Sequence, residues 1–209
     1  MRISELSSET GVPVPTIKYY LREDLLPAGT PTAPNQADYG TEHARRLRLI
    51  RVLAEIGNLP ISTIREVLRS IDDRDTSMHE VLGVAHHALA RRLETSLPPD
   101  EVMAAREAVD RFLDDQLGWA VGADAPGRRE LAEALTALRS LGWRVDARVF
   151  TRYARSADRL AAWELEQTPA GDDRVKTVES VVVGTVVFEV VLDALRRLAQ
   201  EHHSAARYG

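Results

Sequence analysis

Lys18, Tyr19 and Arg22 are the residues whose types and spacing most favour a chemical role in this chain. Residues 14–24 fit a helix, and at 3.6 residues per turn Pro15 shares one face of it with these three side chains. Cations neutralise phosphate, and a tyrosine hydroxyl donates a hydrogen bond to it. This face therefore predicts contact with a nucleic-acid backbone, and the alternative is an ordinary solvated helix surface.

The opposite face of the same segment is apolar. Val14, Ile17, Tyr20 and Leu21 fall on one stripe of the helix, so we expect Tyr20 to point into a core. The adjacent tyrosines would then have different roles, because neighbouring side chains on a helix lie about 100° apart. Tyr20 would stabilise the fold, and Tyr19 would meet a partner.

The surrounding elements must position this helix. Gly11 favours a tight turn after a first short helix, and Pro13 and Pro15 suit the start of the second. The stretch 25–39 holds three prolines and a glycine, which predicts a loop or small hairpin. Thr41 is expected to cap a third helix that Gly57 ends, and a fourth helix follows. This order is typical of a helix-turn-helix with a wing.

At this point the sequence resembles the MerR family of transcriptional regulators. The resemblance is carried by ISELSSETGVPVPTIKYYLREDLLP and ADYGTEHARRLRLIRVLAEIGNLPISTIREVL, within about residues 2–68. It implies a dimer whose second helix enters the major groove of double-stranded DNA. The DNA contacts implied by matching positions are Thr16, Lys18, Tyr19 and Tyr39, and Arg22 is added by the helical wheel alone. The chain departs from the family pattern at Pro15, at Leu21 and at the wing residues Asn35-Gln36-Ala37.

Composition excludes several other classes of function. The chain has 209 residues, a net charge of -5 and no cysteine, so thiolate metal sites and disulfides are excluded. The adjacent histidine pairs at 86–87 and 202–203 diverge on a helix, and no nucleophile motif or phosphate loop occurs. We therefore expect no catalytic residues, no metal and no cofactor. The N-terminus lacks the apolar core of a signal peptide, which predicts a cytoplasmic protein.

The expected domains are a winged helix-turn-helix at 1–71, a linker at 72–77 and an all-helical dimerisation or effector domain at 78–209. Helices are predicted near 78–96, 100–118, 128–141, 146–168 and 173–203. This second part resembles the helical effector domains of actinobacterial MerR-type regulators, which leaves a small-molecule effector open. Its three tryptophans, Trp119, Trp143 and Trp163, are expected in a core more than around a pocket.

The segment 173–203 holds seven valines between positions 181 and 191, which locally favour a strand, but its polar residues recur at helical spacing. A helix this apolar needs a cover, and we expect two subunits to pair through it. Pairing through 78–96 is the alternative. Two other functions stay open: an architectural or excisionase-like DNA-binding protein without a ligand, and a small-molecule-binding protein whose DNA domain is vestigial.

Overall fold

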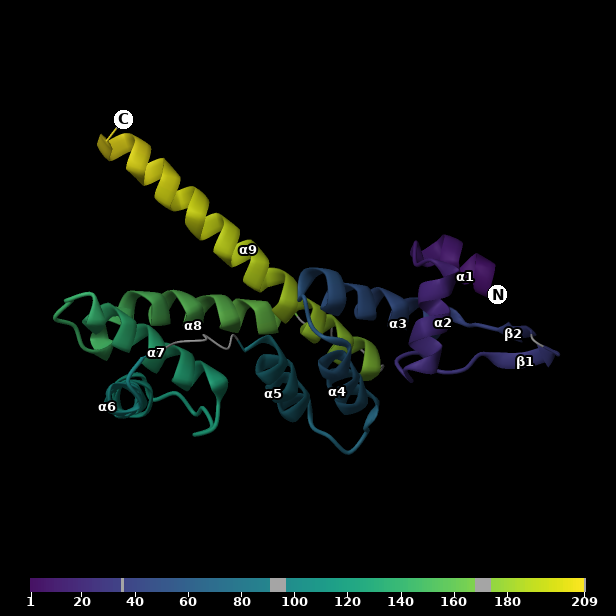
Figure 1. Ribbon diagram of the computed structural model, residues 1–209, viewed down its shortest axis with the longest axis horizontal. Helices are drawn as coiled ribbons and strands as arrows, with labels where there is room; N and C mark the ends of the chain where they lie inside the picture. Colours follow the sequence, from purple (N-terminus) through teal and green to yellow (C-terminus); the bar gives the residue numbers. More distant parts are fainter. Residues whose placement is uncertain (35, 91–96, 168–173, 209) are drawn as a thin grey trace. The chain divides into compact units, whose positions relative to one another are not determined.

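The computed structural model describes residues 1–34, 36–90, 97–167 and 174–208, which are mainly helical with one small hairpin (Figure 1). The chain divides into two compact units. Unit 1 is Met1–Ala88 with Pro169–Gly209, and unit 2 is Leu89–Thr168. The predicted fold class is confirmed. Residues of the predicted segment 78–209 are shared between the two units, and the boundary at 72–77 stays a prediction.

Unit 1 begins with the helix-turn-helix. Helix α1 spans Ile3–Thr10, α2 spans Val14–Arg22, and Gly11 joins them with a φ of 69°, a conformation that glycine adopts without strain. Strands β1 (Thr30–Ala33) and β2 (Gln36–Asp38) form an antiparallel hairpin whose register shifts between Pro31 and Ala33. The predicted hairpin is therefore present, and Asn35, one of the predicted wing residues, lies outside the described residues.

Four further helices complete unit 1. Helix α3 (Thr41–Arg51) continues into a π-helical turn, η1 (Val52–Ile56), and is followed by α4 (Ile61–Asp72) and α5 (Met78–Leu89). The long helix α9 (Arg174–Tyr208) confirms the helical interpretation of the valine-rich segment. Fully buried apolar side chains from α1 to α4 form the core of this unit: Leu6, Ile17, Leu25, Leu47, Ile50, Leu53, Ile64, Val67 and Ile71.

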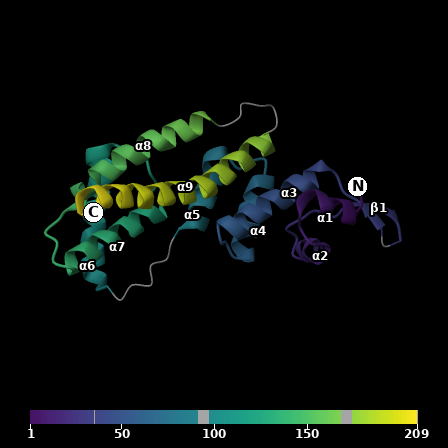
Figure 2. The same ribbon diagram turned by 90° about the horizontal axis from the view of Figure 1, so that it is seen from above.

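Helix α9 returns to pack on elements made much earlier in the chain, η1 and α4 (Figure 2). Val178, Val182 and Val186 are buried on one face of α9, because side chains at i, i+4 and i+8 point the same way. A Cβ placed on Gly57 would lie 3.2 Å from a Val186 methyl carbon, so the glycine allows the close approach. The first part of α9 is thus a structural component of unit 1.

Unit 2 is a small helical assembly. It contains α6 (Pro99–Arg111), a π-helical turn η2 (Phe112–Leu117), α7 (Pro126–Ser140), a 3-10 turn η3 (Ala147–Phe150) and α8 (Thr151–Glu166). Trp119 packs against its core, as predicted, but Trp143 and Trp163 are 57% and 51% exposed. The prediction that all three tryptophans are core residues is therefore wrong for these two. The core itself is built from Ala105, Val109, Phe112, Leu113, Ala132, Leu135, Ala147 and Ala154.

None of the helices in the described ranges combines the length and the apolar character needed to cross a membrane.

Candidate nucleic-acid interface

The turn between α1 and α2 fixes where the second helix points. The Gly11 amide donates to the Ser7 carbonyl (2.9 Å), and the Ser7 hydroxyl donates to the Val12 carbonyl (2.7 Å). Pro13 then occupies the N-cap position of α2, where its missing N–H costs nothing. The path between the two helices is therefore held by hydrogen bonds at one end and by a rigid ring at the other.

Helix α2 has the two faces that its sequence predicts. Ile17 is fully buried and Tyr20 is 8% exposed, and burial raises the pKa of the Tyr20 phenol. Lys18 and Arg22 are exposed on the other side, with Tyr19 half-buried between them. The guanidinium carbon of Arg22 lies 6.0 Å from the centroid of the Tyr19 ring, within range of a cation–π contact. Tyr20 therefore belongs to the core, and Tyr19 and the two cations form one outward surface.

The charges of this surface are not neutralised by the protein. Within the described ranges, Lys18 and Arg22 form no ion pair, so both positive charges face solvent. Thr16, on the same helix, is partly exposed and adds a hydroxyl. Two cations, a phenol and a hydroxyl on one helix could bind phosphates and base edges together.

The arginines of α3 differ, because each one is paired inside unit 1. Three of these pairs tie α3 to distant elements of unit 1, and all four leave little positive charge for a partner. The N–O distances are 2.7 Å for Arg45–Glu179, 2.6 Å for Arg46–Asp72, 2.8 Å for Arg48–Glu9 and 3.1 Å for Arg51–Glu55. The basic character of this helix in the sequence is therefore mostly structural.

Tyr39, a predicted DNA contact, lies at the base of the hairpin and is 8% exposed. Its backbone is clamped by the first residue: the Tyr39 amide donates to the Met1 carbonyl (2.8 Å), and the Met1 ammonium donates to the Tyr39 carbonyl (2.9 Å). Its ring meets His43 edge-on at 5.2 Å between centroids. A Cβ on Gly29 would lie 3.0 Å from this ring, so a larger residue there would displace it. Because it is almost fully buried, Tyr39 offers little surface to a partner.

His43 is a residue that sequence reasoning missed. Thr41 was expected to cap α3, but Gly40 is the N-cap, and its amide donates to Nδ1 of His43 at 3.0 Å. The prediction was wrong because the helix begins one residue earlier than expected, after Gly40, which has no side chain that could cap it. The His43 ring, three positions later, accepts a hydrogen bond from the Gly40 amide instead. The signal was available in the sequence as a polar side chain at the third helical position.

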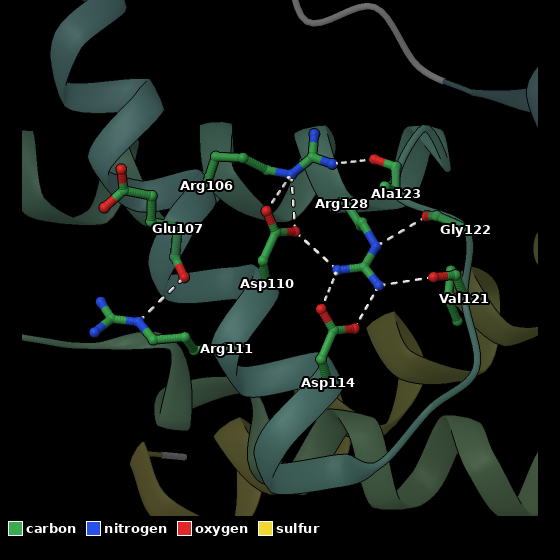
Figure 3. Close-up of polar contacts among 9 residues, drawn as sticks. All are labelled: Arg106, Glu107, Asp110, Arg111, Asp114, Val121, Gly122, Ala123 and Arg128. Atoms are coloured by element: carbon green, nitrogen blue, oxygen red, sulfur yellow. Dashed lines mark hydrogen bonds and ion pairs between the residues drawn. The ribbon is translucent and has the colours of Figure 1, made fainter.

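A second cluster of charged residues lies in unit 2 and is centred on Arg128 (Figure 3). Its guanidinium donates to Asp110 (2.8 Å) and Asp114 (2.5 Å), and also to the carbonyls of Val121 (2.8 Å) and Gly122 (3.0 Å). A second bond to Asp114 (3.2 Å) uses the last of the five donors, and the side chain is only 4% exposed. With no donor left for a ligand, this arginine fixes the loop after η2 and is not a binding site.

Across the described ranges, no three His, Cys, Asp or Glu side chains gather where one ion could be held.

Comparison with known proteins agrees with this geometry. Residues 1–71 match the family described as MerR HTH family regulatory protein. The nodulation protein NolA of Bradyrhizobium sp. (strain NC92) is 36% identical over 81 residues, which are 39% of this chain and only 32% of NolA. The crystal structure of SCO5550 from Streptomyces coelicolor A3(2), a protein assigned to the transcriptional regulators, is 40% identical. It matches all of this chain and 98% of its own, with a TM-score of 0.78. The chain belongs to the MerR family of helix-turn-helix transcriptional regulators.

Proposed function

We propose that this cytoplasmic protein binds a promoter operator in double-stranded DNA with α2 as its reading helix. Lys18, Arg22 and Tyr19 supply the contacts to the phosphate backbone, and Thr16 lies where base edges can be reached. Tyr39 is the least accessible member of the set and would make only a small contact with DNA. No step of this function needs catalysis.

One observation carries the proposal: the cations of α2 are exposed and unpaired within the described part of unit 1, whereas those of α3 are paired with carboxylates. Free cations release the counterions of DNA when they bind, and paired ones must first lose a partner. The binding surface is therefore α2 and its immediate surroundings.

The operator is proposed to have two-fold symmetry. A single helix of nine residues reads only a few base pairs, so useful specificity requires two copies on two half-sites. A homodimer with a two-fold axis matches such a site by symmetry. A dimer with two α2 helices would also offer four free cations to the phosphates.

A second candidate function is the binding of an apolar small molecule by unit 2. Trp143 is 57% exposed, and Leu141, two residues before it, is 76% exposed, so neither side chain is used in the core. An indole ring of this kind can stack on a flat ligand. Quenching of tryptophan fluorescence by candidate effectors, in wild type and in Trp143→Ala, tests this directly.

The main test is DNA binding measured by fluorescence anisotropy on the region upstream of the protein's own gene. Lys18→Ala and Arg22→Ala should each weaken binding by about 1–3 kcal/mol if they read bases, and by less if they only meet phosphate. Arg155→Ala is the matched control, because Arg155 is an equally exposed arginine on α8 of unit 2. If the α2 variants bind DNA as well as the control does, α2 is not the reading helix.

A further inference from the structure

We propose that Arg65 is a positioning residue for DNA recognition, because it holds the C-terminal end of α2 through Glu23 and so fixes the orientation of the reading helix. The inference rests on the proposed function for the use of α2 on DNA, whereas the contact itself is a feature of unit 1. Arg65 lies on α4 and is 42 positions from Glu23 in the chain.

Helix α2 ends in a backbone turn that usually contains glycine. The Leu25 amide donates to the Tyr20 carbonyl at 3.0 Å. The Asp24 amide donates to the Leu21 carbonyl at 3.4 Å, and the two bonds together form a Schellman motif. The left-handed residue of this motif is Asp24, with a φ of 55°, which strains a residue that carries a Cβ. Such a conformation persists only where surrounding contacts hold it.

Arg65 supplies one of these contacts, with two donors. Its Nε donates to the backbone carbonyl of Glu23, the C-cap residue of α2, at 3.1 Å, and its Nη2 donates to the Glu23 carboxylate at 2.7 Å. One guanidinium thus binds the main chain and the side chain of the same residue, which the planar fork of arginine allows. The Arg65 and Glu23 side chains are 28% and 36% exposed, so water screens the pair only in part. A cation at this end of a helix also complements its dipole.

A second arginine holds the chain just beyond the helix. Arg46 of α3 is 8% exposed, and its Nε donates to the Leu25 carbonyl at 3.1 Å. Its two terminal nitrogens bind the carboxylate of Asp72, the last residue of α4, at 2.7 and 2.6 Å. Because Arg46 is buried, its removal would disturb the core, whereas the partly exposed Arg65 can be replaced in a folded protein. Arg65 is therefore the contact whose role can be measured.

The place of Glu23 makes this contact relevant to DNA. Glu23 directly follows Arg22, one of the two free cations of α2. Arg65 could act there by neutralising a carboxylate that repels phosphate, or by holding the helix in place. Holding is the role assigned here, because the bond to the Glu23 carbonyl neutralises no charge. Base contacts depend on hydrogen-bond geometry, whereas attraction to phosphate falls off slowly with distance, so a small shift of α2 would weaken the base contacts first.

Discrimination between two DNA duplexes tests the assignment. Fluorescence anisotropy of the full-length protein compares a duplex from upstream of its own gene with a scrambled duplex of the same composition. Arg65→Met keeps the apolar stem and removes both donors. It should weaken binding to the upstream duplex about tenfold or more, and binding to the scrambled duplex by less than about threefold.

Arg69→Met is the matched control, because Arg69 is an exposed arginine of the same helix that forms no ion pair within the described ranges. This variant removes the same charge from α4 and should keep the discrimination of wild type. A control that loses as much discrimination as Arg65→Met, or an Arg65→Met protein that keeps it, overturns the assignment.

Substitution of Glu23 separates charge from position. Glu23→Gln removes the carboxylate charge but keeps the carbonyl that Arg65 binds, so its affinity for the upstream duplex should stay within about threefold of wild type. Glu23→Gln/Arg65→Met removes the charge and both contacts. If Arg65 acted only by neutralising Glu23, this double variant would bind like wild type. We expect it to bind as weakly as Arg65→Met, and full recovery would contradict the positioning role.

Hydrogen exchange tests the hold on α2 without DNA. The Leu25 and Leu26 amides both donate to the Tyr20 carbonyl, and they should exchange about tenfold faster in Arg65→Met than in wild type or Arg69→Met. Unchanged exchange would show that Arg65 does not hold this end. Faster exchange with unaltered discrimination would remove the positioning role and leave the proposed function intact. Faster exchange together with normal DNA binding by Lys18→Ala and Arg22→Ala would instead remove the proposed function and leave the hold on α2.

Discussion

At the scale of single residues, we expect the two adjacent tyrosines of α2 to have different roles, Tyr20 in stability and Tyr19 in DNA recognition. Tyr20→Ala should lower the free energy of unfolding by about 3–5 kcal/mol, as for other buried aromatic side chains. Tyr19→Ala should leave stability within about 1 kcal/mol of wild type, and should weaken DNA binding several-fold because Arg22 loses the ring that orients it. Thermal melts and anisotropy titrations of both variants give the comparison. A Tyr20→Ala protein that melts like wild type would reverse the two roles.

Asp110 makes the stability of unit 2 sensitive to acid. Burial raises its pKa, but hydrogen bonds from Arg128 and Arg106 outweigh burial and hold the pKa of this carboxyl below its ordinary value. A carboxyl whose pKa is lower in the folded state stabilises the fold at pH values above its unfolded pKa, which is about 4. This stabilisation is lost as the pH falls through the folded pKa. Asp110→Asn should therefore lower stability at pH 7 by about 1 kcal/mol, since the side chain is partly solvent-screened.

Calorimetry at pH 7 and at pH 3 measures this effect, and the difference between Asp110→Asn and wild type should shrink at the lower pH. Asp115→Asn is the control, because Asp115 is an exposed carboxylate of η2 that forms no ion pair within the described ranges. A difference between Asp110→Asn and wild type that persists unchanged at pH 3 would show that the ion pairs are not its source.

At the scale of elements, the contact between η1 and α9 depends on a missing side chain. A Cβ on Gly57 would lie 2.8 Å from the Leu53 carbonyl and 3.2 Å from Val186, so Gly57→Ala should destabilise unit 1 by about 1–3 kcal/mol through overpacking. Gly83→Ala, in the middle of α5, meets nothing within 4 Å and should stabilise by about 0.5–1 kcal/mol. Chemical denaturation of the two variants should shift the midpoint in opposite directions. Equal midpoint shifts for the two variants would mean that the packing of α9 against Gly57 does not limit the space for a side chain there.

Local patterns in the sequence predicted most elements and both faces of α2. Helices form from short-range periodicity, so Ile17 and Tyr20 could be assigned to a core and Lys18 to the surface from the sequence alone. The predicted helix 100–118 is present as α6 followed by η2, and the predicted helix 146–168 as η3 followed by α8. Of the predicted helix 78–96, α5 covers 78–89, and residues 91–96 lie outside the described residues.

Long-range pairing was not predictable in the same way. Glu179 reads as one more polar residue of a helix, yet it is buried against Arg45, 134 positions earlier in the chain. Helical periodicity predicts which side chains of α9 share a face, but it does not predict which distant element each face packs on. The residues implied as DNA contacts came from the family resemblance more than from spacing, and their roles stay predictions.

At the scale of the whole molecule, the distribution of free charge predicts an unusually weak dependence of DNA binding on salt. Residues 23–44 contain no lysine or arginine, and the arginines of α3 are paired, so we expect Lys18 and Arg22 to be the main phosphate contacts of each subunit of the proposed dimer. The slope of log affinity against log salt should be about -2 to -5 for a dimer. Titrations at roughly 50 to 300 mM salt, where the Debye length is on the order of 10 Å, measure this slope. A slope near -10 would mean that the α3 pairs open on DNA.

The order of assembly during synthesis follows from the way unit 1 is built. Its two parts, Met1–Ala88 and the segment that contains α9, are separated by all of unit 2. The ribosome therefore completes the helix-turn-helix and unit 2 before α9 exists, and the face of η1 and α4 that receives Val178, Val182 and Val186 remains uncovered until then. We therefore expect unit 1 to complete its core only after α9 has been synthesised and has packed on η1 and α4.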